Sequence, residues 1–197
     1  MRVERLKEEL PLEVDIWAYD LRPGLPPQGL PREEVYKGSR YSAEHFAYLF
    51  QVAEEAGINM VLPALVANTG KAHEATEFAK EAGKPFEYNR AVFRAYWEGG
   101  EDIGQADVLC RLAGECGMDG EELRRALAEG RYRQRVEEQM RWSRQAGIGG
   151  IPTFVFSTGG GSASGGTDRF ALMGAQSYEV FLDVAQRLLR GELPAGD

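Results

Sequence analysis

One stretch constrains the fold of this chain more than any other: Gly147-Ile148-Gly149-Gly150-Ile151-Pro152-Thr153-Phe154-Val155-Phe156. Three glycines in four positions let the backbone turn or approach another molecule closely. Because proline lacks an N–H group, Pro152 suits the first residue of a strand, and the β-branched and aromatic residues after it are typical of one. The bond Ile151–Pro152 is where we predict a cis peptide, since an X-Pro bond prefers trans by only about 0.5–1 kcal/mol. The plainer alternative is an ordinary helix-to-strand connection in an α/β protein.

The composition limits what the chain can bind. Its 197 residues are enough for one core, or for one core with an inserted subdomain. A net charge of −8 argues against a nucleic-acid partner, which requires a basic face. The longest apolar run, residues 60–67, is far shorter than the roughly 20 residues of a membrane-spanning helix, and the charged residues 1–10 lack the apolar core of a signal peptide. We therefore predict a cytoplasmic protein with no membrane partner.

The two cysteines, Cys110 and Cys116, do not form a redox motif. Six positions along one predicted helix separate them by about 9 Å and roughly 240° of turn, which is beyond disulfide reach. With two histidines, His45 and His73, they match no metal-ligand spacing, so we predict no metal site. Helical cysteines with apolar neighbours usually act as small buried hydrophobic residues.

The order of predicted elements indicates a sheet interrupted by helices. Residues 13–21 have apolar side chains on both faces, which predicts a buried strand. Residues 22–31 contain four prolines and read as a boundary loop. Residues 42–147 show helical periodicity with glycine stops, and Asp119 is a predicted N-cap. Apolar stripes support three of these helices: Phe46, Leu49, Phe50 and Ala53, then Ala72, Ala75 and Ala79, then Val92, Phe93, Tyr96 and Trp97.

After Pro152 the pattern changes to that of a hairpin. Strands are predicted over residues 153–156 and 169–173, with the glycine-rich residues 157–168 between them. Because no Gly-Lys-Ser/Thr sequence closes this run, we interpret it as a flexible hairpin tip rather than a phosphate loop. A last helix follows, capped by Ser177.

Four segments in order resemble one family. They are Leu21-Arg22-Pro23 with its proline-rich loop, Asn68-Thr69-Gly70-Lys71-Ala72-His73, Ala95-Tyr96-Trp97-Glu98-Gly99 and the Gly147–Val155 stretch. Together they resemble the DsbA-type thioredoxin-fold proteins, in particular the cytoplasmic FrnE-like branch. The 2-hydroxychromene-2-carboxylate isomerases and kappa-class glutathione transferases are cousins of that branch. The resemblance runs over nearly the whole chain.

The resemblance implies an α/β fold, a thioredoxin-like domain with an all-helical insertion. The thioredoxin-like part would comprise residues 1–31 and 148–197, and the insertion residues 32–147. In that fold a strand lies between the strand at residues 13–21 and the one at 153–156. The sequence lacks it, so we expect its place to be filled by a segment upstream of Met1, by a strand from a second copy in a homodimer, or by residues 1–4.

The resemblance also implies a function and its site. In redox members a Cys-x-x-Cys pair opens the helix after the first core strand, and in the cousins a serine stands at that place and glutathione is the cofactor. This sequence has neither feature at that place, so no catalytic residue is assigned. The implied substrate-binding residues are Gly150, Ile151, Pro152, His73 and Asn68. The alternative for His73 is an ordinary helix residue, and His45 is interpreted as one.

The first hypothesis is a thiol-disulfide oxidoreductase that acts on protein or small-molecule thiols and disulfides. The alternatives are a redox-inactive peptide-binding or scaffold protein of the same fold, and an isomerase or transferase with glutathione as cofactor. The sequence by itself implies no cofactor.

Overall fold

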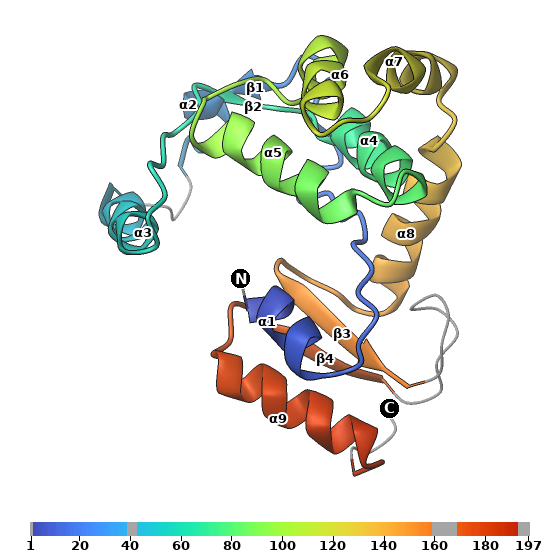
Figure 1. Cartoon of the computed structure of the whole chain (residues 1–197). Coiled ribbons are helices and arrows are strands. Elements are labelled where there is room, and N and C mark those ends of the chain that lie inside the picture. Colours follow the sequence, from blue (N-terminus) through green and yellow to red (C-terminus); the bar gives the residue numbers. More distant parts are fainter. Residues whose placement is uncertain (1, 39–42, 159–168, 193–197) are drawn as a thin grey trace. The chain divides into compact units, whose positions relative to one another are not determined.

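The computed structural model describes residues 2–38, 43–158 and 169–192 (Figure 1). The chain forms two compact units, and each is described by itself. Unit 1 comprises residues 1–21 and 139–197, and unit 2 comprises residues 22–138. The sequence predicts boundaries after residues 31 and 147, and both lie further along the chain than the boundaries between these two units.

Unit 1 contains a two-stranded antiparallel sheet with helices packed beside it. The strands β3 (Thr153–Ser157) and β4 (Arg169–Met173) pair from Thr153 opposite Met173 to Ser157 opposite Arg169, so the predicted hairpin is confirmed. The predicted hairpin tip falls largely on residues 159–168, outside the described residues. Two helices complete the unit, α1 (Arg2–Glu9) and α9 (Tyr178–Leu189).

The core of unit 1 lies between these helices and one face of the sheet. Its buried members are Leu6, Tyr178, Phe181 and Ala185. Alternate residues of β3 reach it, because Phe154 and Phe156 lie two positions apart and so share a face. The rings of Phe154 and Phe181 meet edge to face with their centroids 4.6 Å apart. The ring of Phe181 in α9 therefore contacts both of the phenylalanines that β3 turns toward the core.

The strand predicted over residues 13–21 is wrong, because residues 11–20 have no regular secondary structure. Side chains hold this segment instead of a ladder. The N–H of Ala18 donates to Oε1 of Gln139 at 2.8 Å, and the hydroxyl of Tyr19 donates to the carbonyl of Ile148 at 3.0 Å. The apolar pattern predicts an extended segment that is covered by other residues. A strand also requires a neighbouring backbone to hydrogen-bond with, and among the described residues no backbone pairs with this segment.

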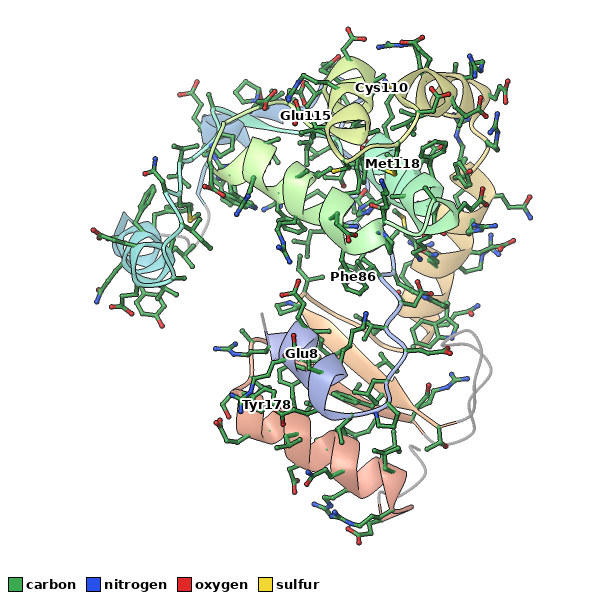
Figure 2. All side chains as sticks on the ribbon, viewed as in Figure 1. Glu8, Phe86, Cys110, Glu115, Met118 and Tyr178 are labelled. Carbon is green, nitrogen blue, oxygen red and sulfur yellow. The ribbon has the colours of Figure 1, made fainter. Side chains whose placement is uncertain are left out.

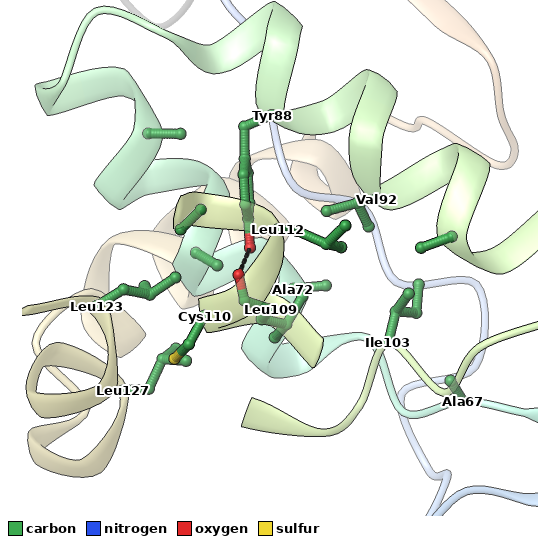
Figure 3. Packing of buried hydrophobic residues seen from close by; sticks show 14 residues of the cluster. Ala67, Ala72, Tyr88, Val92, Ile103, Leu109, Cys110, Leu112, Leu123 and Leu127 are labelled. Carbon is green, nitrogen blue, oxygen red and sulfur yellow. Dashed lines mark hydrogen bonds between the residues drawn. The ribbon is translucent and has the colours of Figure 1, made fainter. Parts of the chain in front are cut away.

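Unit 2 is mainly helical. A two-residue ladder joins β1 (Leu30–Pro31) to β2 (Leu65–Val66). The helices are α2 (Arg32–Val35), α3 (Ala43–Glu55), α4 (Gly70–Glu81), α5 (Pro85–Trp97), α6 (Ala106–Glu115), α7 (Gly120–Glu129) and the first part of α8 (Arg133–Gln145). The middle four, α4 to α7, pack on one another around a common core (Figure 3).

Tyr88 is the largest side chain buried completely in that core. Its hydroxyl donates to the carbonyl of Leu109 at 3.1 Å and so joins α5 to α6 (Figure 3). Helices α6 and α7 approach closely at Gly120, where a Cβ atom would come within 2.6 Å of the Cys110 carbonyl oxygen. Asp119 caps α7 as predicted, because its carboxylate accepts the N–H groups of Glu121 and Glu122.

The three predicted apolar stripes behave differently. Ala72, Ala75 and Ala79 are buried in the core of unit 2, as their spacing predicts. In α3 only Ala53 of the predicted stripe is buried, while Phe50 is exposed. The prediction from this stripe is therefore wrong for Phe50. In α5, Val92 is buried as predicted, whereas Phe93 is 62% exposed, so the prediction from that stripe is wrong for Phe93.

Leu109→Ala tests the core of unit 2. Leu109 is completely buried, so we expect the free energy of unfolding to fall by about 2–5 kcal/mol. Leu189→Ala is the matched control, because Leu189 is 53% exposed and its truncation should change stability by less than about 0.5 kcal/mol. Urea unfolding followed by circular dichroism measures both. Equal losses in the two variants would show that Leu109 does not belong to a packed core.

Candidate functional site

The segment from Ile148 to Pro152, here called the proline segment, leads from α8 into β3. Gly147 ends the helix with φ at 71°, a left-handed value that favours glycine, and the Ile148 N–H then donates to the Ser143 carbonyl at 3.0 Å. The peptide bond between Ile151 and Pro152 is cis. The Pro152 carbonyl accepts the N–H of Gly174 at 2.8 Å, which fixes the end of the segment to the end of β4.

Ile151 offers unused hydrogen-bonding groups. Neither its N–H nor its carbonyl has a hydrogen-bond partner among the residues that the structure describes. Its side chain is 54% exposed. The two preceding glycines, Gly149 and Gly150, have open space where a Cβ atom would stand. One donor, one acceptor and a free approach are the requirements for pairing with another extended backbone.

The strand that follows also has an open edge. Within the described ranges, β3 pairs with β4 alone. The carbonyl of Gly150 accepts the Thr153 hydroxyl at 2.7 Å, which fixes the turn that leads into the strand. The proline segment is therefore held at both ends, while the Ile151 peptide groups between these anchors are free to bind.

Asn68 lies in unit 2, before α4, and its side chain already has two partners. Its Nδ2 donates to the Leu25 carbonyl at 2.8 Å, and its Oδ1 accepts the Gly70 N–H at 3.0 Å. These contacts join the proline-rich loop to the start of the helix. They account for an asparagine at this position on structural grounds, and its predicted role in substrate binding stays a prediction.

His73 lies in the first turn of α4 and is half-buried. The next residue, Glu74, is buried, and burial raises the pKa of its carboxyl group, although Arg133, 4.0 Å away, acts in the opposite direction. Asn68 and His73 thus share unit 2, whereas Gly150, Ile151 and Pro152 belong to unit 1. The sequence-predicted site residues therefore form two groups, one in each unit.

The two cysteines are free thiols in unit 2. Cys110 is buried among the core residues of α6 and α7 (Figures 2 and 3), and Cys116 lies at the end of α6. Burial raises the pKa of both thiols, and for Cys110 the nearby Arg124 lowers it only in part. A thiol must ionise to act as a nucleophile, so neither cysteine is prepared for disulfide exchange.

Two further findings concern other kinds of site. Within the described ranges, no three histidine, cysteine, aspartate or glutamate side chains come together in a way that would hold a metal ion. The helices of the described ranges are all too short or too polar to cross a lipid bilayer.

Sequence reasoning missed a polar cluster in unit 2. The guanidinium of Arg32 contacts the hydroxyl of Tyr96, and that hydroxyl also donates to the Leu65 carbonyl at 3.2 Å. Burial raises the pKa of Tyr96 above the ordinary value for tyrosine, which already lies well above neutral pH. The residues are far apart in the sequence and match no short motif, so only the fold brings them together.

Comparison with known proteins assigns the family. The model of the DsbA-like thioredoxin domain matches residues 1–186, and the chain therefore belongs to the DsbA-like thioredoxin family. An uncharacterised Bacillus subtilis protein, YwbO, is 31% identical over 147 residues, which are 73% of this chain and 72% of that protein. The predicted family is confirmed.

Solved structures show the same fold. A probable DsbA oxidoreductase from Streptomyces coelicolor has a TM-score of 0.78 at 22% identity, over 100% of this chain and 85% of that one. A 2-hydroxychromene-2-carboxylate isomerase has a TM-score of 0.62 at 17% identity, over 96% of this chain and 86% of that one. These likenesses confirm the predicted α/β thioredoxin-like fold with helical insertion.

The thiol pKa values predict slow alkylation. A raised pKa leaves less thiolate at pH 7, so iodoacetamide should modify both cysteines more slowly than free cysteine, whose pKa is about 8.5. Each rate should rise about tenfold per pH unit until the pH passes the raised pKa. Mass spectrometry of wild type, Cys110→Ser and Cys116→Ser assigns the two rates. Modification of either cysteine faster than free cysteine at pH 7 would show that burial does not control the reactivity of that thiol.

Proposed function

We propose that this protein is a substrate-binding member of the DsbA-like thiol-disulfide oxidoreductase family, and that the proline segment holds an extended peptide. The observation that carries the proposal is the pair of unpartnered backbone groups on Ile151. An extended peptide that pairs with this residue would continue along the open edge of β3, by the strand-addition mode common in peptide recognition.

The chemistry of the segment favours a peptide over glutathione as the ligand. Residues 146–157 and 170–178 carry no charged side chain of their own, so the proline segment itself supplies no cation to the two carboxylates of glutathione. The guanidinium of Arg5 lies 3.8 Å from the centroid of the Tyr178 ring, but it is paired with Glu9. Backbone pairing, in contrast, requires no charge. The partners we propose are therefore proteins with thiols or disulfides in extended segments, and small-molecule thiols are the weaker alternative.

The redox step is separate from binding. Thiol-disulfide exchange begins with attack by a thiolate, and residues 1–197 include only Cys110 and Cys116, neither of which is a Cys-x-x-Cys member. A chain restricted to these residues therefore binds without exchanging disulfides, and it would serve as a peptide-binding scaffold. A cytoplasmic location and a homodimer also belong to the proposal, and neither follows from the geometry of the site.

Two substitutions at Ile151 separate backbone pairing from side-chain binding. Ile151→Pro removes the N–H donor, and we expect an extended apolar peptide to bind about tenfold more weakly, as for one lost hydrogen bond. Ile151→Ala keeps the donor and removes the side chain, and it should retain most of the affinity. Calorimetric titration measures the affinities, and amide shifts in NMR spectra locate the bound peptide. Similar affinities for the wild type and Ile151→Pro would refute backbone pairing.

The insulin-reduction assay tests the redox part. We expect the 197-residue chain to show no turnover in the presence of dithiothreitol above the uncatalysed rate, because no accessible low-pKa thiol is present among its two cysteines. A DsbA-family protein with an intact Cys-x-x-Cys pair is the positive control. Turnover that disappears in Cys110→Ser would show that the assignment of that thiol as unreactive is wrong.

A further inference from the structure

Arg32 is a cation without a counter-charge among the described residues. It begins α2, directly after the short strand β1, and it is half-buried. Its Nε donates to the Pro63 carbonyl at 2.5 Å, and Nη2 contacts the Tyr96 hydroxyl at 3.3 Å. The remaining nitrogen, Nη1, is buried and has no hydrogen-bond partner in the described part of the chain.

The missing partner is unusual in so acidic a chain. The sequence has 31 acidic residues against 23 basic ones. Exposed arginines such as Arg111, Arg124 and Arg131 each pair with a carboxylate. Arg32, which is more buried than these, has no carboxylate within 4.0 Å in the described ranges. A buried N–H group normally has an acceptor, and at Nη1 of a guanidinium an anionic acceptor would also balance the charge.

The neighbours of Arg32 are two aromatic rings and a second cation, and only the cation favours an anion here. Tyr36 and Trp97 lie beside the guanidinium, with ring centroids 5.3 Å and 6.0 Å from its central carbon. A second cation, Arg22, lies 5.0 Å from the same Tyr36 ring. The rings contribute weak cation–π attraction at these distances, but they provide no acceptor for the N–H groups of Nη1.

Tyr96 explains why the guanidinium can bind another group. Its hydroxyl donates its proton to the Leu65 carbonyl, and its oxygen accepts a hydrogen bond from Nη2 of Arg32. At 3.3 Å this bond from Nη2 is long, so Nη2 is only weakly satisfied. A planar guanidinium binds a carboxylate or phosphate through two parallel hydrogen bonds. In Arg32 the two terminal nitrogens are the ones that are least well satisfied.

We propose that Arg32, with Tyr96 beside it, binds the carboxylate or phosphate group of a small anionic ligand. Because Nη1 is covered by protein, a neighbouring side chain must move to admit the ligand, and the long contact with Tyr96 is the weakest one that holds the guanidinium. The site is built from unit 2 alone. It therefore stands or falls independently of peptide binding at the proline segment.

Thermal unfolding at constant ionic strength tests the proposal. The probes are sodium phosphate and sodium acetate, each exchanged against sodium chloride. Once the concentration of the binding anion exceeds its Kd, we expect the Tm of the wild type to rise by about 3–6 °C for each further tenfold increase in that concentration. A rise with phosphate alone identifies a phosphate group as the ligand, and a rise with acetate alone identifies a carboxylate. No rise with either salt would overturn the proposal.

A matched pair of variants ties the effect to Arg32. Arg32→Gln should abolish the dependence on the anion, whereas Arg94→Gln, which removes an exposed arginine from α5, should retain it. Equal dependence in the two variants would overturn the proposal. Should Arg32→Gln fail to fold, the wild type still decides the matter, because the Arg32 Nε–H resonance, assigned with Arg32→Lys, must shift on titration. A resonance that does not move with either salt also overturns it.

Discussion

The backbone hydrogen-bonding capacity of β3 is the constraint on which unit 1 depends. Every strand has donors and acceptors on two edges, and buried groups without partners cost about 1–3 kcal/mol each. In the described ranges β3 satisfies one edge through β4 and leaves the other open. A two-stranded hairpin is marginally stable by itself, so the contacts of Phe154 and Phe156 with α9 are what hold it in place.

Unit 2 meets the same constraint in a different way. Its helices satisfy their backbone groups internally, and their side chains then need only to fill the space between them. The buried hydroxyl of Tyr88 finds its acceptor on Leu109. Not every buried polar atom of the unit is satisfied in this way, because Oε2 of the buried Glu74 and Nη1 of Arg32 have no hydrogen-bond partner in the described part of the chain. Arg32 differs from Glu74 in its charge and in its place, where α2 meets the end of α5, and this is the group for which we propose an anionic ligand.

Local patterns in the sequence predict those parts of the fold that depend on local physics. The alanine stripe of α4, the Asp119 cap and the hairpin of β3 and β4 each follow from a few neighbouring residues, and all three are present. The strand expected over residues 13–21 fails because a strand also needs a partner. Likewise, the Phe46–Ala53 stripe predicts a helix correctly, but it does not say which element covers the apolar face. The same holds for the candidate sites. The proline segment can be predicted, because glycine and proline determine the backbone over short distances. The contacts of Arg32 cannot be predicted, because they depend on the packing of α2, β2 and α5.

Peptide binding and thiol-disulfide exchange require different groups, and we propose that this chain provides the groups for the first. A peptide can be held by backbone groups, whose availability depends on geometry and hardly on pH. Disulfide exchange needs a thiolate beside the bound sulfur, and a thiolate requires a positive electrostatic environment or solvent access. Cys110 is buried, and burial raises its pKa by more than the nearby Arg124 lowers it. The backbone groups that we propose for peptide binding therefore do not depend on a reactive thiol. The same binding site can serve an oxidoreductase when a cysteine pair lies beside it, and a scaffold when none does.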